Sequence, residues 1–310
     1  MSAEPAVLAR NTSYFTFALV AQKVISFLYF TFLARTLGPT NIGKYVFALS
    51  LTTIFSVLLD LGLAPVLTRE VARDKSIAER YVRLVFGFKA VVGLMVIGLV
   101  ALTINLLGYP EITRQLVYLA SIVMLLDSFV LSTYATIRGF QNLSWESIGT
   151  IVFQTAVAAA GFTVAHFTHD LRFFMGALIF GALVNFVYAL WQLKWRFQLH
   201  IKPILNWQGW RALFIIAWPF TVAAILTRVY GYIDTVFLSL LSGDRAVGIY
   251  SVAYKITFAL QFIPTAFSAS LFPGFSAYFG KEPQKLGETF ARGIVYLTAI
   301  AVPVSDQPQP

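Results

Sequence analysis

The sequence contains no cysteine, and charged residues make up only 12% of its 310 positions. The missing cysteine excludes disulfides and thiol chemistry. The low fraction of charged residues is more informative, because a soluble domain carries roughly 25% charged residues to cover its water-facing surface. With 58% hydrophobic residues and a mean hydropathy of +0.75, most of the surface is expected to have lipid as its solvent.

Several signatures of chemistry are also missing. There is no glycine-rich phosphate loop, so we expect no ATP hydrolysis by this chain. His166 and His169 have i, i+3 spacing but no further ligand nearby in the sequence, which favours a solvated loop over a zinc site. The net charge of +9 comes from short clusters between apolar segments, which argues against a nucleic-acid partner. We therefore expect neither an enzyme nor a cofactor-dependent protein.

Eight apolar segments are long enough to cross a bilayer, which takes about 20 residues. This pattern predicts an all-α polytopic membrane protein. The expected helices cover Thr12–Ala34, Tyr45–Leu67, Val82–Leu107, Gln115–Ile137, Ser147–Phe167, Arg172–Leu193, Ala212–Leu241 and Ala246–Phe272.

The cations between these segments indicate the topology. Fourteen Lys and Arg residues lie at the N-terminus and in the loops of one side, against five on the other, which predicts a cytoplasmic N-terminus. The segment Lys194–Arg211 mixes cations with Trp195, Trp207 and Trp210, which predicts a linker lying on the cytoplasmic surface.

An internal repeat links the first two segments to the last two. A shift of 205 residues aligns them without a gap, and the motif G-x-x-x-x-G-x-Y-x-x-A begins at Gly38 in one copy and at Gly243 in the other. Glycine suits a tight turn that requires positive φ, so both glycines are expected between helices. The copies are an even number of helices apart and share one orientation, as in transporters with a site between two lobes. A chance likeness of apolar hairpins is the competing explanation.

Further motifs resemble the polysaccharide biosynthesis flippases. They are Leu33-Ala34-Arg35 through Leu37-Gly38-Pro39, Gly43-x-Tyr45, Asp60-x-Gly62-Leu63, Arg69-Glu70-x-Ala72-Arg73, Arg138-Gly139-x-Gln141, Asp234-Thr235 and Gly248-x-Tyr250-x-x-Ala253-x-Lys255. The resemblance covers nearly the whole chain and implies the multidrug/oligosaccharidyl-lipid/polysaccharide exporter fold. In that fold two six-helix lobes flank a cavity between helices 1, 2, 7 and 8.

The resemblance also implies how the chain is divided. Residues 1–193 would form an N-terminal six-helix lobe, 194–211 a linker, and 212–310 the first two to three helices of a second, parallel-repeat lobe. A ninth apolar segment, Gly293–Val304, is followed by a polar end and is shorter than a span of about 20 residues. We therefore expect a second lobe that stops before it is complete.

Among the charged residues inside the expected spans, five are candidates for a site or its partners: Lys23, Asp127, Arg228, Asp234 and Lys255. A charge at the bilayer centre costs roughly 2.5–3.5 kcal/mol on insertion scales, so each requires a partner, a wet cavity or a function. Lys23 and Arg228 are equivalent under the repeat. This equivalence favours a pocket in which Lys23, Arg228 and Lys255 bind an anionic head group, over simple pairing with Asp127 and Asp234.

The remaining charges are assigned by position. Asp234 is placed in the binding site, either paired with a cation of a neighbouring helix or holding a coupling cation, and both interpretations stay open. Asp127 is expected to be a structural partner. Asp60 is expected to form ion pairs between loops near the cytoplasmic surface. Lys89 lies about two turns inside its span, so its ammonium is expected to reach the cytoplasm and to matter little.

Together the repeat and the cations suggest a transporter for an anionic substrate, and the resemblance supplies its class. The expected function is translocation of an undecaprenyl-pyrophosphate-linked oligosaccharide across the cytoplasmic membrane by alternating access. The expected partners are this lipid-linked substrate and membrane lipids, with the polysaccharide polymerase and glycosyltransferases as candidates. Three alternatives remain: a cation-coupled multidrug exporter, which needs a net acidic cavity; a membrane enzyme, which needs a large outer loop; and a nonfunctional fragment.

Overall fold

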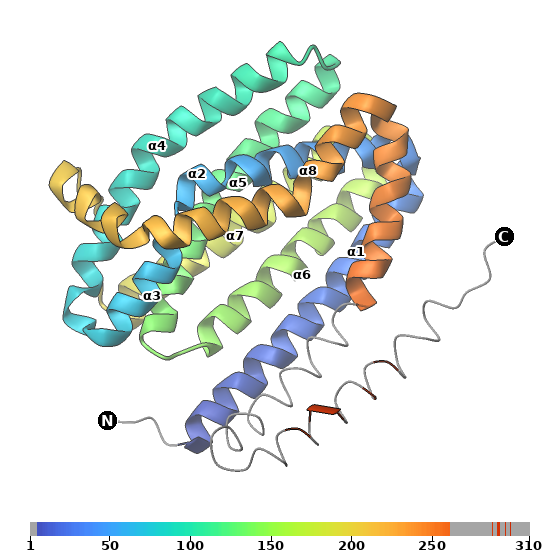
Figure 1. The fold of residues 1–310 in the computed structure, drawn as a ribbon. Helices are drawn as coiled ribbons and strands as arrows, with labels where there is room; N and C mark the ends of the chain where they lie inside the picture. Colours follow the sequence, from blue (N-terminus) through green and yellow to red (C-terminus); the bar gives the residue numbers. More distant parts are fainter. Residues whose placement is uncertain (1–4, 261–286, 288–289, 292–294, 296–297, 299–310) are drawn as a thin grey trace. The chain divides into compact units, whose positions relative to one another are not determined.

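A computed structural model of the chain describes residues 5–260 together with 287, 290, 291, 295 and 298. All regular elements in this described part are helical, as the sequence predicts (Figure 1). They are α1 (Pro5–Phe55), α2 (Val57–Asp60), α3 (Leu63–Arg73), a 3-10 turn (Lys75–Ile77), α4 (Ala78–Leu106), α5 (Glu111–Gly139), α6 (Ser144–Phe167), α7 (Leu171–Trp191), a π-helical turn (Gln192–Arg196) and α8 (Trp207–Leu260).

Six helical stretches of the described part are long and apolar enough to cross a membrane. Two of them, Val20–Asp60 and Trp207–Thr257, are 41 and 51 residues long, about twice the length of one crossing. Each is interrupted at one glycine with non-helical backbone angles, Gly38 (φ 74°, ψ 169°) in the first and Gly243 (φ 79°, ψ 177°) in the second. The breaks confirm the two glycine turns expected from the repeat, and they divide six long stretches into the eight expected crossings.

The second expected span differs from its prediction. The sequence predicts one helix over Tyr45–Leu67, but α1 ends at Phe55, α2 is only four residues long, and α3 begins at Leu63. Between α2 and α3, Leu61 (φ 42°) and Gly62 (φ 71°) are left-handed. Average hydropathy did not reveal this break, because the apolar residues on both sides of Asp60 keep the mean high enough for one continuous span.

The core lies where the helices of the first two hundred residues meet. Its largest cluster joins α1, α4, α5, α6 and α7 through buried side chains such as Leu33, Phe47, Val100, Leu116 and Phe174. On α4, Leu94, Met95 and Leu102 point outward and are exposed. Outward leucines and methionines are stable against lipid tails, so the outer surface fits a membrane as its solvent.

Two helix starts outside the spans are capped by aspartates. Asp74 accepts hydrogen bonds from the backbone N–H and the hydroxyl of Ser76, and these bonds lower the pKa of the Asp74 carboxyl. Asp170 accepts from the backbone N–H of Arg172 at 2.9 Å, which lowers the pKa of Asp170 in the same way. Each cap satisfies a backbone donor that the following helix leaves free.

The linker after α7 is attached to α4. The backbone N–H of Ile204 donates to the carbonyl of Arg83 at 2.9 Å, and the indole N–H of Trp210 donates to the carbonyl of Leu84 at 2.9 Å. Trp195 and Trp207 are exposed. The exposed tryptophans suit the expected position at a membrane surface, while the hydrogen bonds hold the beginning of α8 against α4.

Two compact units divide the chain, Met1–Val252 and Ala253–Pro310. Every contact described below lies within the first. The end of the eighth expected span and most of the ninth segment lie outside the described residues.

Candidate functional site

The structure brings Asp127 of α5 and Arg228 of α8 into one region. The guanidinium of Arg228 acts electrostatically on the Asp127 carboxylate, although the two form no direct ion pair. Asp127 itself is exposed on α5.

Besides the Trp210 hydrogen bond, two side-chain hydrogen bonds on either side of Arg228 attach α8 to preceding segments of the chain. Near its beginning, the Thr221 hydroxyl donates to the Leu61 carbonyl at 2.6 Å. Farther along, the Tyr109 hydroxyl donates to the hydroxyl of Ser239 at 2.9 Å. Residues 222, 223 and 225–227 are exposed, so α8 contacts its neighbours less between these two attachments.

Lys23 and Arg228 keep their equivalence in three dimensions. Lys23 precedes the Gly38 break by 15 residues, and Arg228 precedes the Gly243 break by the same 15. Lys23 is exposed on α1 and Arg228 is half-buried on α8. Lys255 belongs to the second compact unit. A cavity shared by all three cations therefore stays a prediction.

Asp234 has a tyrosine as its partner. The Tyr250 hydroxyl donates to the Asp234 carboxylate, and the backbone N–H of Thr235 donates to the same carboxylate. A cation on a neighbouring helix, one of the two interpretations from sequence, forms no ion pair with Asp234 among the described residues. Tyr250 lies in the repeat motif, which was the available signal for this pair.

The equivalent positions in the first copy hold a different pair. Tyr29 corresponds to Asp234 and Tyr45 to Tyr250 under the 205-residue shift. The hydroxyl of Tyr29 is buried without a hydrogen-bond partner in the structure. The repeat thus preserves the backbone but places a carboxylate in only one copy.

The prediction for Lys89 was wrong. Lys89 does not reach the cytoplasm: its exposed fraction is 0%, and its ammonium lies 3.3 Å from the Asp60 carboxylate and 2.6 Å from the Ser128 carbonyl oxygen. Asp60 therefore pairs with a residue of α4 rather than with a loop. The carboxylate of Glu70 takes the cations of its own helix, Arg69 at 2.7 Å and Arg73 at 3.9 Å.

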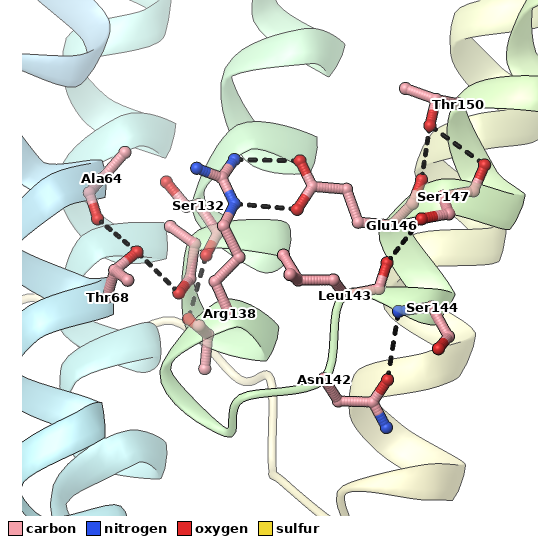
Figure 2. Close-up of polar contacts among 12 residues, drawn as sticks. Ala64, Thr68, Ser132, Arg138, Asn142, Leu143, Ser144, Glu146, Ser147 and Thr150 are labelled. Carbon is pink, nitrogen blue, oxygen red and sulfur yellow. Dashed lines mark hydrogen bonds and ion pairs between the residues drawn. The ribbon is translucent and has the colours of Figure 1, made fainter. Parts of the chain in front are cut away.

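Sequence reasoning also missed the partner of Arg138. Figure 2 shows the Arg138 guanidinium forked onto the Glu146 carboxylate, with Nε to Oε2 at 2.8 Å and Nη2 to Oε1 at 3.0 Å. The pair joins the end of α5 to the start of α6. Beside it, the Thr68 hydroxyl of α3 donates to the carbonyl of Ala135 at 2.9 Å (Figure 2). These bonds give this turn a structural role.

Comparison with known proteins gives the family. Residues 8–279 match the family model described as "Polysaccharide biosynthesis protein". The chain is 21% identical over 298 residues to a probable low-salt glycan biosynthesis flippase, Agl15, of Haloferax volcanii, covering 96% of this chain and 61% of that protein. It is 23% identical over 279 residues to a putative O-antigen transporter of Escherichia coli K12, covering 87% and 65%.

A third relative is the capsular polysaccharide biosynthesis protein CapF of Staphylococcus aureus, 21% identical over 253 residues, with 80% of this chain and 61% of the relative covered. The chain therefore spans less than two thirds of the length of these curated relatives.

Solved structures show the same fold. An inward-facing multidrug resistance MATE family transporter of the MOP superfamily matches with a TM-score of 0.69 at 14% identity, covering 91% of this chain and 68% of the other. A MOP superfamily transporter from Pyrococcus furiosus, described as having a binding pocket of reverse polarity, matches with a TM-score of 0.58 at 13% identity, covering 96% of this chain and 70% of the other. At these identities the match establishes the MATE-like fold and nothing about substrate.

Proposed function

The chain belongs to the polysaccharide biosynthesis protein family, and on that premise we propose that it moves a lipid-linked oligosaccharide from the inner to the outer leaflet of the cytoplasmic membrane. The proposed substrate is an undecaprenyl-pyrophosphate-linked unit, and the proposed mechanism is alternating access between two lobes. The N-terminus is placed in the cytoplasm on the distribution of Lys and Arg between the loops.

One observation carries the proposal: Arg228 is half-buried on a broken, repeat-related helix, where its charge acts on Asp127 without a direct ion pair between the two. A guanidinium not bound in a direct ion pair has donors available for an anion. Its planar fork matches the oxygens of a phosphate group, and such charge-assisted bonds are among the strongest that a side chain offers.

The equivalent Lys23 supports the same proposal from the first copy of the repeat. Two cations at symmetry-related positions of two lobes suit a head group that lies between them. The names of the relatives, a glycan biosynthesis flippase and an O-antigen transporter, support a glycan-related substrate. The lipid tails would remain between helices, in contact with the bilayer.

A multidrug exporter is the second candidate, because the solved structures with this fold include multidrug transporters. That function predicts efflux of organic cations, which an acidic cavity attracts. The two candidates are distinguished by expressing the chain in two strains. The first strain lacks its own flippase, and the second lacks its multidrug pumps. Restored surface glycan in the first, without restored cation efflux in the second, supports the proposal. The opposite result replaces it with the exporter.

A further inference from the structure

The buried ammonium of Lys89 joins three elements. Lys89 belongs to α4, and its two acceptors are Asp60, the last residue of α2, and the carbonyl of Ser128 in the middle of α5. Its exposed fraction is the lowest among the charged residues that the structure describes. A buried ammonium needs such partners, so the side chain and both acceptors constrain one another's positions.

The residue next to each acceptor interacts with α8. Leu61 follows Asp60, and its carbonyl accepts the hydroxyl of Thr221. Asp127 precedes Ser128, and its carboxylate is the group on which Arg228 acts. Thr221 and Arg228 are seven residues apart, which is about two helical turns, so both lie on one face of α8.

The left-handed break makes the first of these contacts possible. At Leu61 and Gly62 the chain leaves the helical path, so the Leu61 carbonyl is available to another helix. A Cβ on Gly62 would lie 2.7 Å from the Cβ of Phe220, which shows how closely α8 approaches the break. The Lys89 ammonium contacts Asp60, directly before this break, and the Ser128 carbonyl of α5 at the same time.

We propose that Lys89 is a positioning residue, whose pair with Asp60 aligns the break after α2 and the Asp127 segment of α5 on the Thr221–Arg228 face of α8. The proposal rests on the proposed function, since the site that it positions is the one assigned to the anionic head group. Lys89 itself does not touch the substrate. Its loss changes the placement of Arg228 relative to Asp127 without removing either group.

A purely structural role predicts something different. Replacing both members of a buried ion pair by neutral residues of similar volume is often neutral or stabilising, whereas removing one member leaves a buried unpaired charge. The double variant D60N/K89M therefore recovers stability under both explanations. Only the positioning role predicts that the double variant still fails in alignment and transport.

The 310-residue chain allows a direct measurement of alignment, because its sequence contains no cysteine. Spin labels are attached to Ile122→Cys on α5 and Thr227→Cys on α8, both at exposed positions. The distance distribution between the labels is measured in the parent, K89R, K89M, D60N and D60N/K89M proteins. Glycan export is measured for the same substitutions without labels, at matched protein amounts. R80M removes an exposed cation of the same helix and is the matched control.

We expect one narrow distance distribution in the parent, R80M and K89R proteins. K89M, D60N and D60N/K89M should each give a broadened or displaced distribution and lose export by about tenfold or more, since small misplacements of binding groups have effects of this size. K89R should retain most export because it keeps the charge and its donors.

Parent-like distances and export in D60N/K89M overturn the proposal and leave Lys89 a structural residue. If K89M does not accumulate, D60N carries the same test, and parent-like distances and export there also overturn it. The distance measurement does not depend on transport. Failure of the parent chain to export glycan thus refutes the proposed function while the alignment by Lys89 is still tested.

Discussion

Gly43 and Gly248 pack reciprocally against each other's turns. A Cβ on Gly43 would overlap the carbonyl oxygen of Asp244, and a Cβ on Gly248 would overlap the carbonyl oxygen of Pro39. Under the 205-residue shift Gly248 is equivalent to Gly43 and Asp244 to Pro39, so the two contacts are one contact made twice. The repeat copies therefore meet as a pseudo-symmetric pair, and glycine is the residue that allows it.

Replacing Gly43 or Gly248 by alanine should separate the two turns. Each new methyl group would meet a backbone carbonyl, which cannot rotate away as a side chain would, so we expect a loss of roughly 1–3 kcal/mol of stability from overpacking. Thermal unfolding of the purified protein measures the loss, and glycan export should fall in parallel. Gly231→Ala is the control on α8, because a Cβ there meets nothing within 4 Å. Equal stability of all three variants would show that the turns are not in contact in the membrane.

The second prediction concerns Arg228. Replacement by alanine removes charge-assisted hydrogen bonds worth roughly 1.5–3 kcal/mol each, which corresponds to about a tenfold to hundredfold loss of export. Arg228→Lys should recover only part of this loss, because the bidentate fork is missing. Lys23→Ala should also reduce export. Unchanged export from Arg228→Ala and Lys23→Ala at matched protein levels contradicts a role for these cations in binding.

Substitution of Asp127 distinguishes two roles of Arg228, binding of the head group and pairing with Asp127. If Arg228 mainly balances the charge of Asp127, the double variant Arg228→Ala with Asp127→Asn should regain export relative to Arg228→Ala alone. If Arg228 binds the head group, the double variant should stay as impaired as the single one. We expect the second result, since the two side chains form no direct ion pair.

The third prediction concerns the Arg138–Glu146 pair. Glu146 has 10% of its side chain exposed and Arg138 has 35%, so only Arg138 can turn to water when its partner is lost. Arg138→Ala should thus destabilise the protein by roughly 1–3 kcal/mol, and by more than Glu146→Gln does. Thermal unfolding of the purified variants measures both.

The exposed pair Arg172–Asp170 is the comparison for that experiment. Its side chains are 53% and 30% exposed, so Arg172→Ala should cost no more than about 1 kcal/mol. A larger loss of stability from Arg172→Ala than from Arg138→Ala would contradict the structural role assigned to the Arg138–Glu146 fork.

The fourth prediction is the topology. Reporter fusions after Lys75 and Lys202 should report the cytoplasm, and fusions after Gly38 and Gly243 the outside. Single introduced cysteines labelled with an impermeant reagent can check the result, because the 310-residue chain has no cysteine of its own. An external position for Lys75 would refute the orientation assigned from the loop charges.

The sequence by itself determined the fold class and the repeat. Long apolar segments can satisfy their backbone groups in lipid only as helices or barrels, so composition and segment length were sufficient for the helices. Glycine tolerates positive φ, so the aligned Gly38 and Gly243 were sufficient to predict both turns. The motifs were sufficient to indicate the family, and residues 8–279 match the family model.

Only the tertiary structure decided how the charges are used. Lys89 looked able to reach water because its distance from the helix end is a local quantity, whereas its burial depends on α2 and α5 packing over it. The Arg138–Glu146 fork likewise joins α5 to α6, and the Tyr250–Asp234 hydrogen bond joins the two parts of α8 on either side of the Gly243 break. A sequence pattern records which side chains share a helix face, but an ion pair between helices is set by which faces meet, and that is a property of the packed bundle.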